Sequence, residues 1–426
     1  MMVFHQPTFR AEMDEMVTSG HVPGRRQSFL VLVMLILAIG ARYATESDTE
    51  EYCSTLELAS LRSKLMAKVE EKFLDIFDEG DIEMVTSGHV PGRPKRAFAV
   101  IGASLKSAQA LGLHQEPSWG QINSVTRELR RRVWWARFVA DGFMALCYGK
   151  SSSIQENEWQ VGMVDDIDDV STTCPGFNST ELREDGTYQR VTIISYQRYK
   201  FNLYRIASPI TRTIYFHRGT TMREVVGRVK EINQRLVEWD RSLPPEWRLK
   251  SFAVEVDEPT LDPTLKTFRL QALRLQELAL QLSYDNMQLL LHRPLLTYTG
   301  GLYSSRLCEN LAGEPGQESL VHDSRTDVPA MGVLDDDLSQ GSGSQCWQSA
   351  IRTSWIGEYP LILRAARNTH VAAYVGIQIF TAAAVLATFA LTDPLSNQAH
   401  IGEQTPRCMD MVLFRLYSSI LHRHNV

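Results

Sequence analysis

The fold is decided by the stretch "RRRVWWARFVADGFMALCYGKSSSI", residues 130–154, which carries a long helical pattern. Apolar side chains recur there every three or four residues, the spacing of one face of an α-helix. They are Leu129, Val133, Ala136, Ala140, Phe143, Met144 and Cys147. Gly149 follows, where a helix end favours a residue that tolerates the left-handed conformation. The stretch therefore predicts a helix that ends at this glycine.

The letters Gly149-Lys150-Ser151 also match the end of a Walker A phosphate-binding loop. That loop needs a further glycine at the position that Met144 occupies here, a strand before it and a helix after it. In this chain the letters follow a predicted helix instead. The sequence therefore favours a helix cap over a nucleotide site.

Helical patterns continue on both sides of this stretch. They cover residues 98–111, 190–216 and 222–241. A long helix opens at Asp262-Pro263, which is a good start signal, and is expected to run to Pro294. Strand alternation is scarce, so the expected fold class is all-α.

A polar insertion interrupts this helical domain. Gly, Ser, Asp and Glu dominate residues 299–345, with too little apolar surface to offset the entropy of ordering. The helical pattern resumes at Cys346 and continues to about Leu421. We therefore expect one large multi-helix regulatory domain. Its main part covers residues 1–298, a disordered insertion covers 299–345, and C-terminal helices cover 346–426.

Composition and charge exclude several classes of protein. The net charge is −6, so the chain as a whole is not a binder of polyanions. The cysteines lie far apart in the sequence, without the close spacing of a zinc knuckle or a small disulfide framework. They are Cys53, Cys147, Cys174, Cys308, Cys346 and Cys408. A reducing compartment fits this pattern, and no cofactor site is expected in this chain.

Two apolar stretches could be mistaken for membrane segments. "FLVLVMLILAIGA" at 29–41 is too short to span a bilayer and predicts a buried helix. Residues 371–391 reach spanning length, but their alanines, threonines and Gln378 make them only weakly hydrophobic. The sequence favours a core helix there over a membrane helix, and no membrane partner is expected.

The arginine run 130–132 raises the question of phosphate binding. Three consecutive residues on a helix fan over most of its circumference rather than forming one basic stripe. Acidic residues without basic ones follow at 155–170, so intramolecular pairing is favoured, with Arg137 and Asp141 as an i,i+4 pair. Of Trp134 and Trp135, one is expected to pack inward and the other against a neighbouring helix or the following loop.

An enzyme alternative comes from "DDIDD" at 165–169, which satisfies the D-D-x-x-D pattern by which helical terpene synthases hold magnesium and diphosphate. Asp165, Asp166 and Asp169 would be the ligands. The second motif of such enzymes is incomplete, since Gly343 stands where its glutamate belongs. The sequence therefore favours a solvated acidic turn.

The peptide "EMVTSGHVPGR" occurs twice without change, at 15–25 and at 83–93. Solenoid repeats recur at regular periods and diverge, so a recent duplication or a gene-model error explains the pair better. The second copy contains Gly and Pro and therefore cannot supply a core helix.

Several motifs together resemble the fungal-specific transcription factor domain, the regulatory region of zinc-binuclear-cluster regulators. They are "LGLHQEPS" at 111–118, "ELRRRVWW" at 128–135, "YGKSSSI" at 148–154, "FHQPTFR" at 4–10, "LAIGARY" at 37–43, "LLLHRPLL" at 289–296 and "LTDPLS" at 391–396. The family signature falls on Arg131, Arg132, Trp134, Trp135, Asp141 and Gly149, for which a structural role is expected. The resemblance covers nearly the whole chain.

The resemblance implies a nuclear, non-enzymatic regulator of RNA polymerase II transcription. Its partners would be the transcription machinery or coregulator proteins, with a small-molecule effector as a further possibility. Zinc and DNA contacts belong to a six-cysteine cluster that such proteins carry N-terminal to this domain and that residues 1–426 do not contain. DNA binding is therefore expected only through such a module. The remaining alternatives are the helical magnesium enzyme and a truncated, non-functional product.

Overall fold

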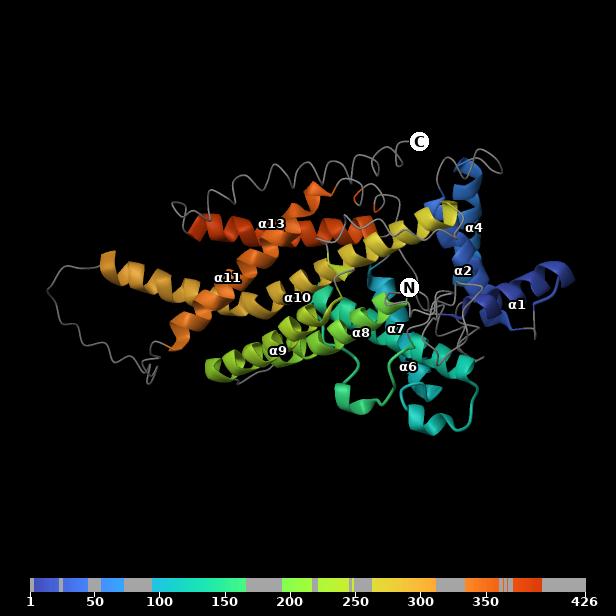
Figure 1. Ribbon diagram of the computed structural model, residues 1–426, viewed down its shortest axis with the longest axis horizontal. Helices are drawn as coiled ribbons and strands as arrows, with labels where there is room; N and C mark the ends of the chain where they lie inside the picture. Colours follow the sequence, from blue (N-terminus) through green and yellow to red (C-terminus); the bar gives the residue numbers. More distant parts are fainter. Residues whose placement is uncertain are drawn as a thin grey trace, which may run out of the picture. The chain divides into compact units, whose positions relative to one another are not determined.

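Figure 1 shows the computed structural model of the chain, in which every regular element of the described residues is a helix. The described residues are 4–22, 26–44, 55–72, 94–165, 194–216, 221–244, 247–248, 263–311, 334–359, 363, 366 and 371–392. Within these ranges one isolated β-bridge joins Gln115 to Gln160. The predicted all-α fold class is confirmed.

The chain forms two compact units, to both of which the long helix α10 (Pro263–Leu311) contributes. The first unit contains α1 (Gln6–Ser19), α2 (Gln27–Tyr43), α4 (Thr55–Lys72), α6 (Pro94–Ala110), α7 (Ser124–Tyr148) and α8 (Ser195–Ala207). The second contains α9 (Met222–Ser242), α11 (Leu334–Ser354) and α13 (Val371–Thr392).

Helix α7 is the central helix of the first unit and packs against α6 and α8. The side chain of Asn123 caps its start by accepting a hydrogen bond from the amide of Thr126 at 2.7 Å. Gly149 ends it in the left-handed conformation, as predicted. All residues from Arg132 to Asp141 are buried, so the helix is enclosed on every side rather than along the one predicted stripe.

Helix α2 carries the apolar stretch of residues 29–41 and packs against α4. Its buried side chains are Phe29, Val31, Leu32, Val33, Met34, Leu35 and Ala38. The prediction of a buried helix is confirmed, since these residues cover several faces of the helix.

Helix α10 continues through Pro294, so the prediction that it ends there is wrong. A proline inside a helix loses one backbone hydrogen bond and crowds the preceding turn, at a cost of about 3 kcal/mol. Leu289, Leu291 and Leu295 are buried on either side of Pro294. We infer that their packing offsets this cost and keeps the helix continuous.

Both ends of the predicted polar insertion, residues 299–345, are helical. Helix α10 enters it from one end and α11 from the other, which leaves residues 312–333 outside the described part of the chain. An established helix extends at little cost because only its first turn carries the penalty of nucleation. The rest of the predicted insertion lies outside the described residues, so its disorder stays a prediction.

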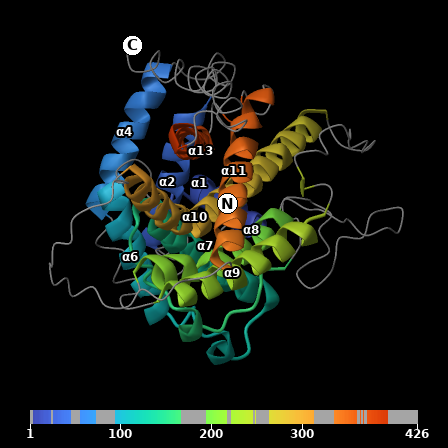
Figure 2. The same ribbon diagram turned by 90° about the vertical axis from the view of Figure 1, so that its left-hand side faces the viewer.

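In the second unit, α11 and α13 cross at a steep angle, which is clear where α13 is seen end-on (Figure 2). The face of α13 that includes Val375, Ile379 and Ala382 is buried. Among the described residues, Tyr374–Leu391 is the one segment long and apolar enough to cross a membrane, and 33% of it is buried. The helix is thus buried along one face and exposed along the other, and the core helix expected from the sequence is buried only in part.

Candidate functional site

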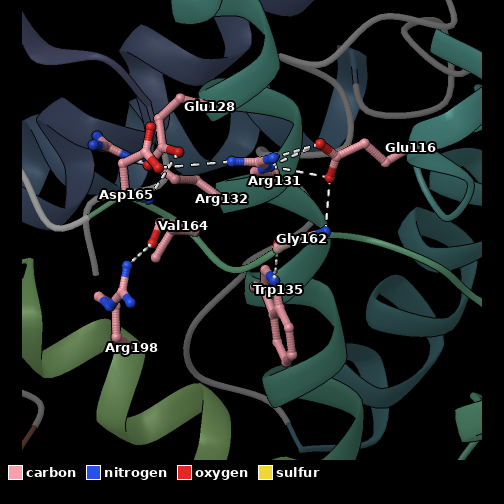
Figure 3. Close-up of polar contacts among 9 residues, drawn as sticks. All are labelled: Glu116, Glu128, Arg131, Arg132, Trp135, Gly162, Val164, Asp165 and Arg198. Atoms are coloured by element: carbon pink, nitrogen blue, oxygen red, sulfur yellow. Dashed lines mark hydrogen bonds and ion pairs between the residues drawn. The ribbon is translucent and has the colours of Figure 1, made fainter. Parts of the chain in front are cut away.

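The two central motifs of the sequence meet in one polar network on α7 (Figure 3). Arg131, from "ELRRRVWW", forms a bidentate ion pair with Glu116, from "LGLHQEPS", with Nη2 2.5 Å from Oε1 and Nε 3.0 Å from Oε2. Arg131 Nη1 also lies 3.7 Å from a carboxylate oxygen of Asp165. The arginine therefore joins two segments that are far from it in the sequence.

Glu116 is held in its ionised form by this arrangement. Its carboxylate also accepts a hydrogen bond from the amide of Gly162 at 2.7 Å. Burial acts to raise the pKa of Glu116, but the hydrogen bonds from Arg131 and Gly162 outweigh it, and the net effect is a lowered pKa. The sequence analysis did not single out Glu116, although it lies within one of the quoted motifs.

Arg132 forms a second ion pair, which is more deeply buried than the pair of Arg131. Its Nε donates to Glu128 Oε1 at 2.8 Å, and the two side chains are only 3% and 1% exposed. The other oxygen of Glu128 accepts the amide of Asp165 at 3.0 Å. Burial raises the pKa of Glu128, and the attraction of Arg132 offsets this only in part.

Trp134 and Trp135 are both fully buried and take different roles. Trp135 donates its indole N–H to the carbonyl oxygen of Gly162 at 2.9 Å. Its ring stacks on Phe201 of α8, with centroids 5.4 Å apart. Trp134 packs inward, within 6.0 Å of the ring of His114. The predicted division between one inward tryptophan and one against a neighbouring helix and the following loop is confirmed.

Asp141 holds the turn after α7 in place through two hydrogen bonds. Its carboxylate accepts the hydroxyl of Ser152 at 2.6 Å and the amide of Ser153 at 2.8 Å. Gly149 has φ 58°, a conformation that favours glycine, and the amides of Gly149 and Lys150 both donate to the carbonyl oxygen of Ala145. These amides are bonded to the helix itself, so they do not form a cradle for phosphate.

Gly162 is a point of close approach rather than of unusual backbone geometry. A Cβ atom at this position would lie 2.9 Å from Nη2 of Arg131. The missing side chain therefore lets the guanidinium lie across the segment. Two residues after Gly162, the carbonyl oxygen of Val164 accepts a hydrogen bond from Arg198 of α8 at 2.7 Å (Figure 3). Side chains of α7 and α8 thus hold residues 150–165 against both helices.

The predicted ion pair between Arg137 and Asp141 is wrong. Arg137 is 1% exposed, and its Nη1 donates instead to Ser104 of α6 at 3.3 Å. Burial lowers the pKa of Arg137 to about 10. The i,i+4 spacing permits a contact on a helix, but here α6 engages one side chain and the following turn engages the other.

The "DDIDD" alternative rests on residues that lie mostly outside the described part of the chain, since only Asp165 falls inside it. Asp165 lies beside Arg131 and donates its amide to Glu128. In the described ranges no group of three or more His, Cys, Asp or Glu side chains could hold a metal ion. The comparisons below give the enzyme alternative no support.

An open pocket of about 580 Å³ lies beside the network. Its lining contains two carboxylates, one guanidinium and one indole, from Glu116, Glu156, Arg205 and Trp159. It contains no serine, cysteine or histidine that could act as a nucleophile or as its base. The lining therefore offers polar and aromatic contacts for binding.

Comparison with known proteins identifies a family. The family model described as "Fungal specific transcription factor domain" matches residues 1–241. The chain is 24% identical over 222 residues to the "Thiamine repressible genes regulatory protein thi1" of Schizosaccharomyces pombe, which is 50% of this chain and 27% of that protein. It is 23% identical over 307 residues to the "Uncharacterized transcriptional regulatory protein C3C7.04" of the same organism, which is 69% of this chain and 34% of that protein.

A third relative is the "Activatory protein CHA4" of Saccharomyces cerevisiae, 23% identical over 266 residues, which is 54% of this chain and 38% of that protein. The matched part of the chain thus corresponds to about a quarter to two fifths of the length of these three relatives. No solved structure matches the chain.

Proposed function

Because this chain belongs to the fungal-specific transcription factor domain family, we propose that it is the regulatory part of a nuclear transcription regulator that acts by binding and not by catalysis. The observation that carries the proposal is the family match over residues 1–241. Three relatives with regulatory names agree with it.

The geometry of the signature residues supports a structural role for them. Two of them, Trp135 and Asp141, bond to the segment that follows α7. The other two form ion pairs within the fold, Arg131 with Glu116 and Arg132 with Glu128. Their polar atoms are used within the fold, so they are poorly placed to act on a substrate. We infer that the signature defines the shape of the domain.

Regulation would then depend on partners of the folded domain. A coregulator protein, a component of the transcription machinery or a small-molecule effector that prefers one conformation would shift the domain toward it by its difference in affinity. Contact with DNA, and the zinc that belongs to it, would come from a module outside residues 1–426. The widely spaced cysteines of this sequence do not supply a six-cysteine cluster.

A reporter experiment tests the proposal. Residues 1–426 are fused to a heterologous DNA-binding module in a fungal cell, and transcription of a gene bearing that module's site is measured. We expect transcription to differ clearly from that produced by the module alone, in either direction. Equal transcription, with both proteins in the nucleus in equal amounts, would argue against a regulatory domain.

A paired variant connects this test to the structure. Arg131→Ala removes the contact with Glu116, whereas Lys106→Ala changes an exposed lysine of α6 outside the network. We expect only the first variant to bring transcription back toward the level of the module alone. If both variants behaved like the unaltered fusion, the polar network would not matter for regulation.

A further inference from the structure

The open pocket beside the α7 network has the size of a small-molecule site. Its volume of about 580 Å³ lies within the range of about 300–1,000 Å³ that ligand pockets commonly have. The lining comes from the segments around Glu116 and Trp159 and from Arg205 of α8, all of which belong to the first unit. We call this cavity the Trp159 pocket.

The two segments that line the Trp159 pocket are fixed by bonds within the fold. The amide of Glu116 donates to the carbonyl oxygen of Gln160 at 2.9 Å, and the amide of Gln160 donates to that of His114 at 2.8 Å. Figure 3 shows Glu116 and Gly162 bonded to each other and to side chains of α7. The pocket is therefore preformed, and a ligand can enter it without first ordering these segments.

Trp159 places an aromatic ring in the lining. This ring packs against three rings of α7, with centroids 6.0 Å from Trp134, 5.0 Å from Trp135 and 5.4 Å from Phe138. The side chain is only partly buried and contributes to the lining of the pocket. A ring held in this way favours a ligand with a planar or apolar group that can pack against it.

Two opposite charges in the lining have no partner within the described part of the chain. Arg205 and Glu156 are both exposed, and neither side chain forms a hydrogen bond or an ion pair there. Glu116 differs from them, because both of its oxygens already accept hydrogen bonds, from Arg131 and from the amide of Gly162. The lining therefore offers a ligand one unpaired positive group and one unpaired negative group.

We propose that the Trp159 pocket binds a free amino acid with an aromatic side chain, a small zwitterion whose two charges match those of the lining. The carboxylate of the ligand pairs with Arg205, since a guanidinium can donate two parallel hydrogen bonds to it. The ammonium group pairs with Glu156, and the aromatic ring packs against Trp159.

The charges of the lining disfavour two simpler classes of ligand. A nucleotide would bring several negative charges close to Glu156 and Glu116, with only Arg205 to receive them, and like charges weaken association. A plain amine would pair with Glu156 but leave Arg205 unpaired beside a second positive charge. A zwitterion satisfies both groups. Any effect of such a ligand on transcription rests on the proposed function, whereas binding itself does not.

A calorimetric titration of the full chain tests the proposal with L-phenylalanine, 3-phenylpropionate and phenethylamine. All three probes carry the same ring, but the second lacks the ammonium group and the third lacks the carboxylate. We expect L-phenylalanine to bind at least about tenfold more tightly than either, because each missing group leaves one charge of the pocket unpaired. Equal affinity for the three probes, or no binding of L-phenylalanine at millimolar concentration, would overturn the proposal.

Variants of the exposed charges locate the binding. Arg205→Gln and Glu156→Gln should each weaken binding of L-phenylalanine at least about tenfold. In Arg205→Gln the preference over phenethylamine should disappear, while the preference over 3-phenylpropionate remains. The matched controls are Glu158→Gln, in the same short helix but outside the lining, and Lys106→Gln on α6, and both should leave binding unchanged. Equal effects of Glu156→Gln and Glu158→Gln would refute binding in this pocket.

The reporter fusion separates this proposal from the proposed function. Binding of L-phenylalanine that is lost in Arg205→Gln supports the site even where the fusion leaves transcription unchanged, a result that counts against the regulatory function alone. Conversely, a fusion that changes transcription, combined with a chain that binds none of the three probes, would overturn the site and leave the regulatory function standing.

Discussion

Helices α7 and α13 show opposite relations between composition and burial. Helix α7 contains five arginines and is nonetheless buried without interruption from Arg132 to Asp141. Helix α13 contains no Asp, Glu, Lys, Arg or His, yet Phe380 and Leu391 are more than two thirds exposed. The more charged helix is the better enclosed one.

The difference shows that partners decide burial, and hydrophobicity alone does not. Carboxylates meet Arg131 and Arg132, and Ser104 meets Arg137, so that these charges are accommodated inside the first unit. The exposed face of α13 with Ile377, Phe380 and Leu391 is apolar, but among the described residues no partner covers it. A polar helix with matched neighbours can therefore form a core, while an apolar helix still needs a second face to pack on.

The largest expected effect comes from Trp135. Trp135→Ala should lower the free energy of unfolding by about 3–5 kcal/mol, since it leaves a large cavity and removes the hydrogen bond to Gly162. Phe380→Ala on α13 should cost only about 1 kcal/mol, because that side chain is 71% exposed. Urea unfolding measures both variants. Equal costs would remove the contrast between the two helices.

The next effect concerns the buried ion pair. Arg132→Met should cost about 3 kcal/mol at pH 7, because the carboxylate of Glu128 stays buried without its counter-ion. Arg130→Met is the matched control from the same run. Arg130 lies over the ring of Trp119, 5.6 Å from its centroid, so its loss should cost only about 0.5–1 kcal/mol. Similar costs would show that burial of the pair contributes little.

Gly162→Ala should have a smaller effect, about 1–2 kcal/mol, because the added Cβ displaces the guanidinium of Arg131 from Glu116. Gly102→Ala provides the control. Nothing lies within 4 Å of a Cβ at residue 102, which is inside α6, so alanine there should stabilise the chain by up to about 1 kcal/mol. Thermal unfolding distinguishes the two. A stabilising Gly162→Ala would contradict the close approach of Arg131 to this residue.

The smallest effect is a pair of opposite pH dependences within α7's network. The pKa of Glu128 is raised, so its contribution to stability is present below its unfolded pKa and is lost as the pH rises through the raised value. The pKa of Glu116 is lowered, so its contribution is present above its unfolded pKa and is lost as the pH falls through the lowered value.

Unfolding measured from pH 3 to 8 separates these two contributions, because both glutamates are expected to have a pKa of about 4.3 in the unfolded chain. Glu128→Gln should remove the loss on the upper side, and Glu116→Gln should remove the loss on the acid side. The cost of Phe380→Ala should not change with pH, because α13 has no group that titrates in this range. If the cost of Phe380→Ala did depend on pH, then α7 and α13 would not differ in their response to pH.

Much of α7 could be predicted from the sequence, because its signals are local. The helical spacing and the glycine at its end depend on a few neighbouring residues. The partners of its charges could not be predicted in the same way. Glu116 and Arg131 are fifteen residues apart and meet only because the chain folds back between them. Arg137 and Asp141 have a favourable spacing but separate, since each finds a different neighbour.

The same distinction explains the errors elsewhere. Pro294 is a local signal for a helix end, but the packing of leucines around it keeps α10 continuous. The polar composition of residues 299–345 marks a weak helix former, but it does not show how far a neighbouring helix extends into it. Local chemistry thus predicts the type of each element better than its limits.

The attachment of residues 150–165 to α7 and α8 has a consequence for the handling of the protein. This segment has little regular secondary structure, so its sequence resembles a site for proteases. A protease needs an exposed segment that can be drawn into its cleft, and such sites concentrate in loops that few contacts hold. Here Trp135, Asp141, Glu128 and Arg198 hold the segment at separate points. Brief digestion should therefore spare it in correctly folded preparations and cut it in misfolded ones.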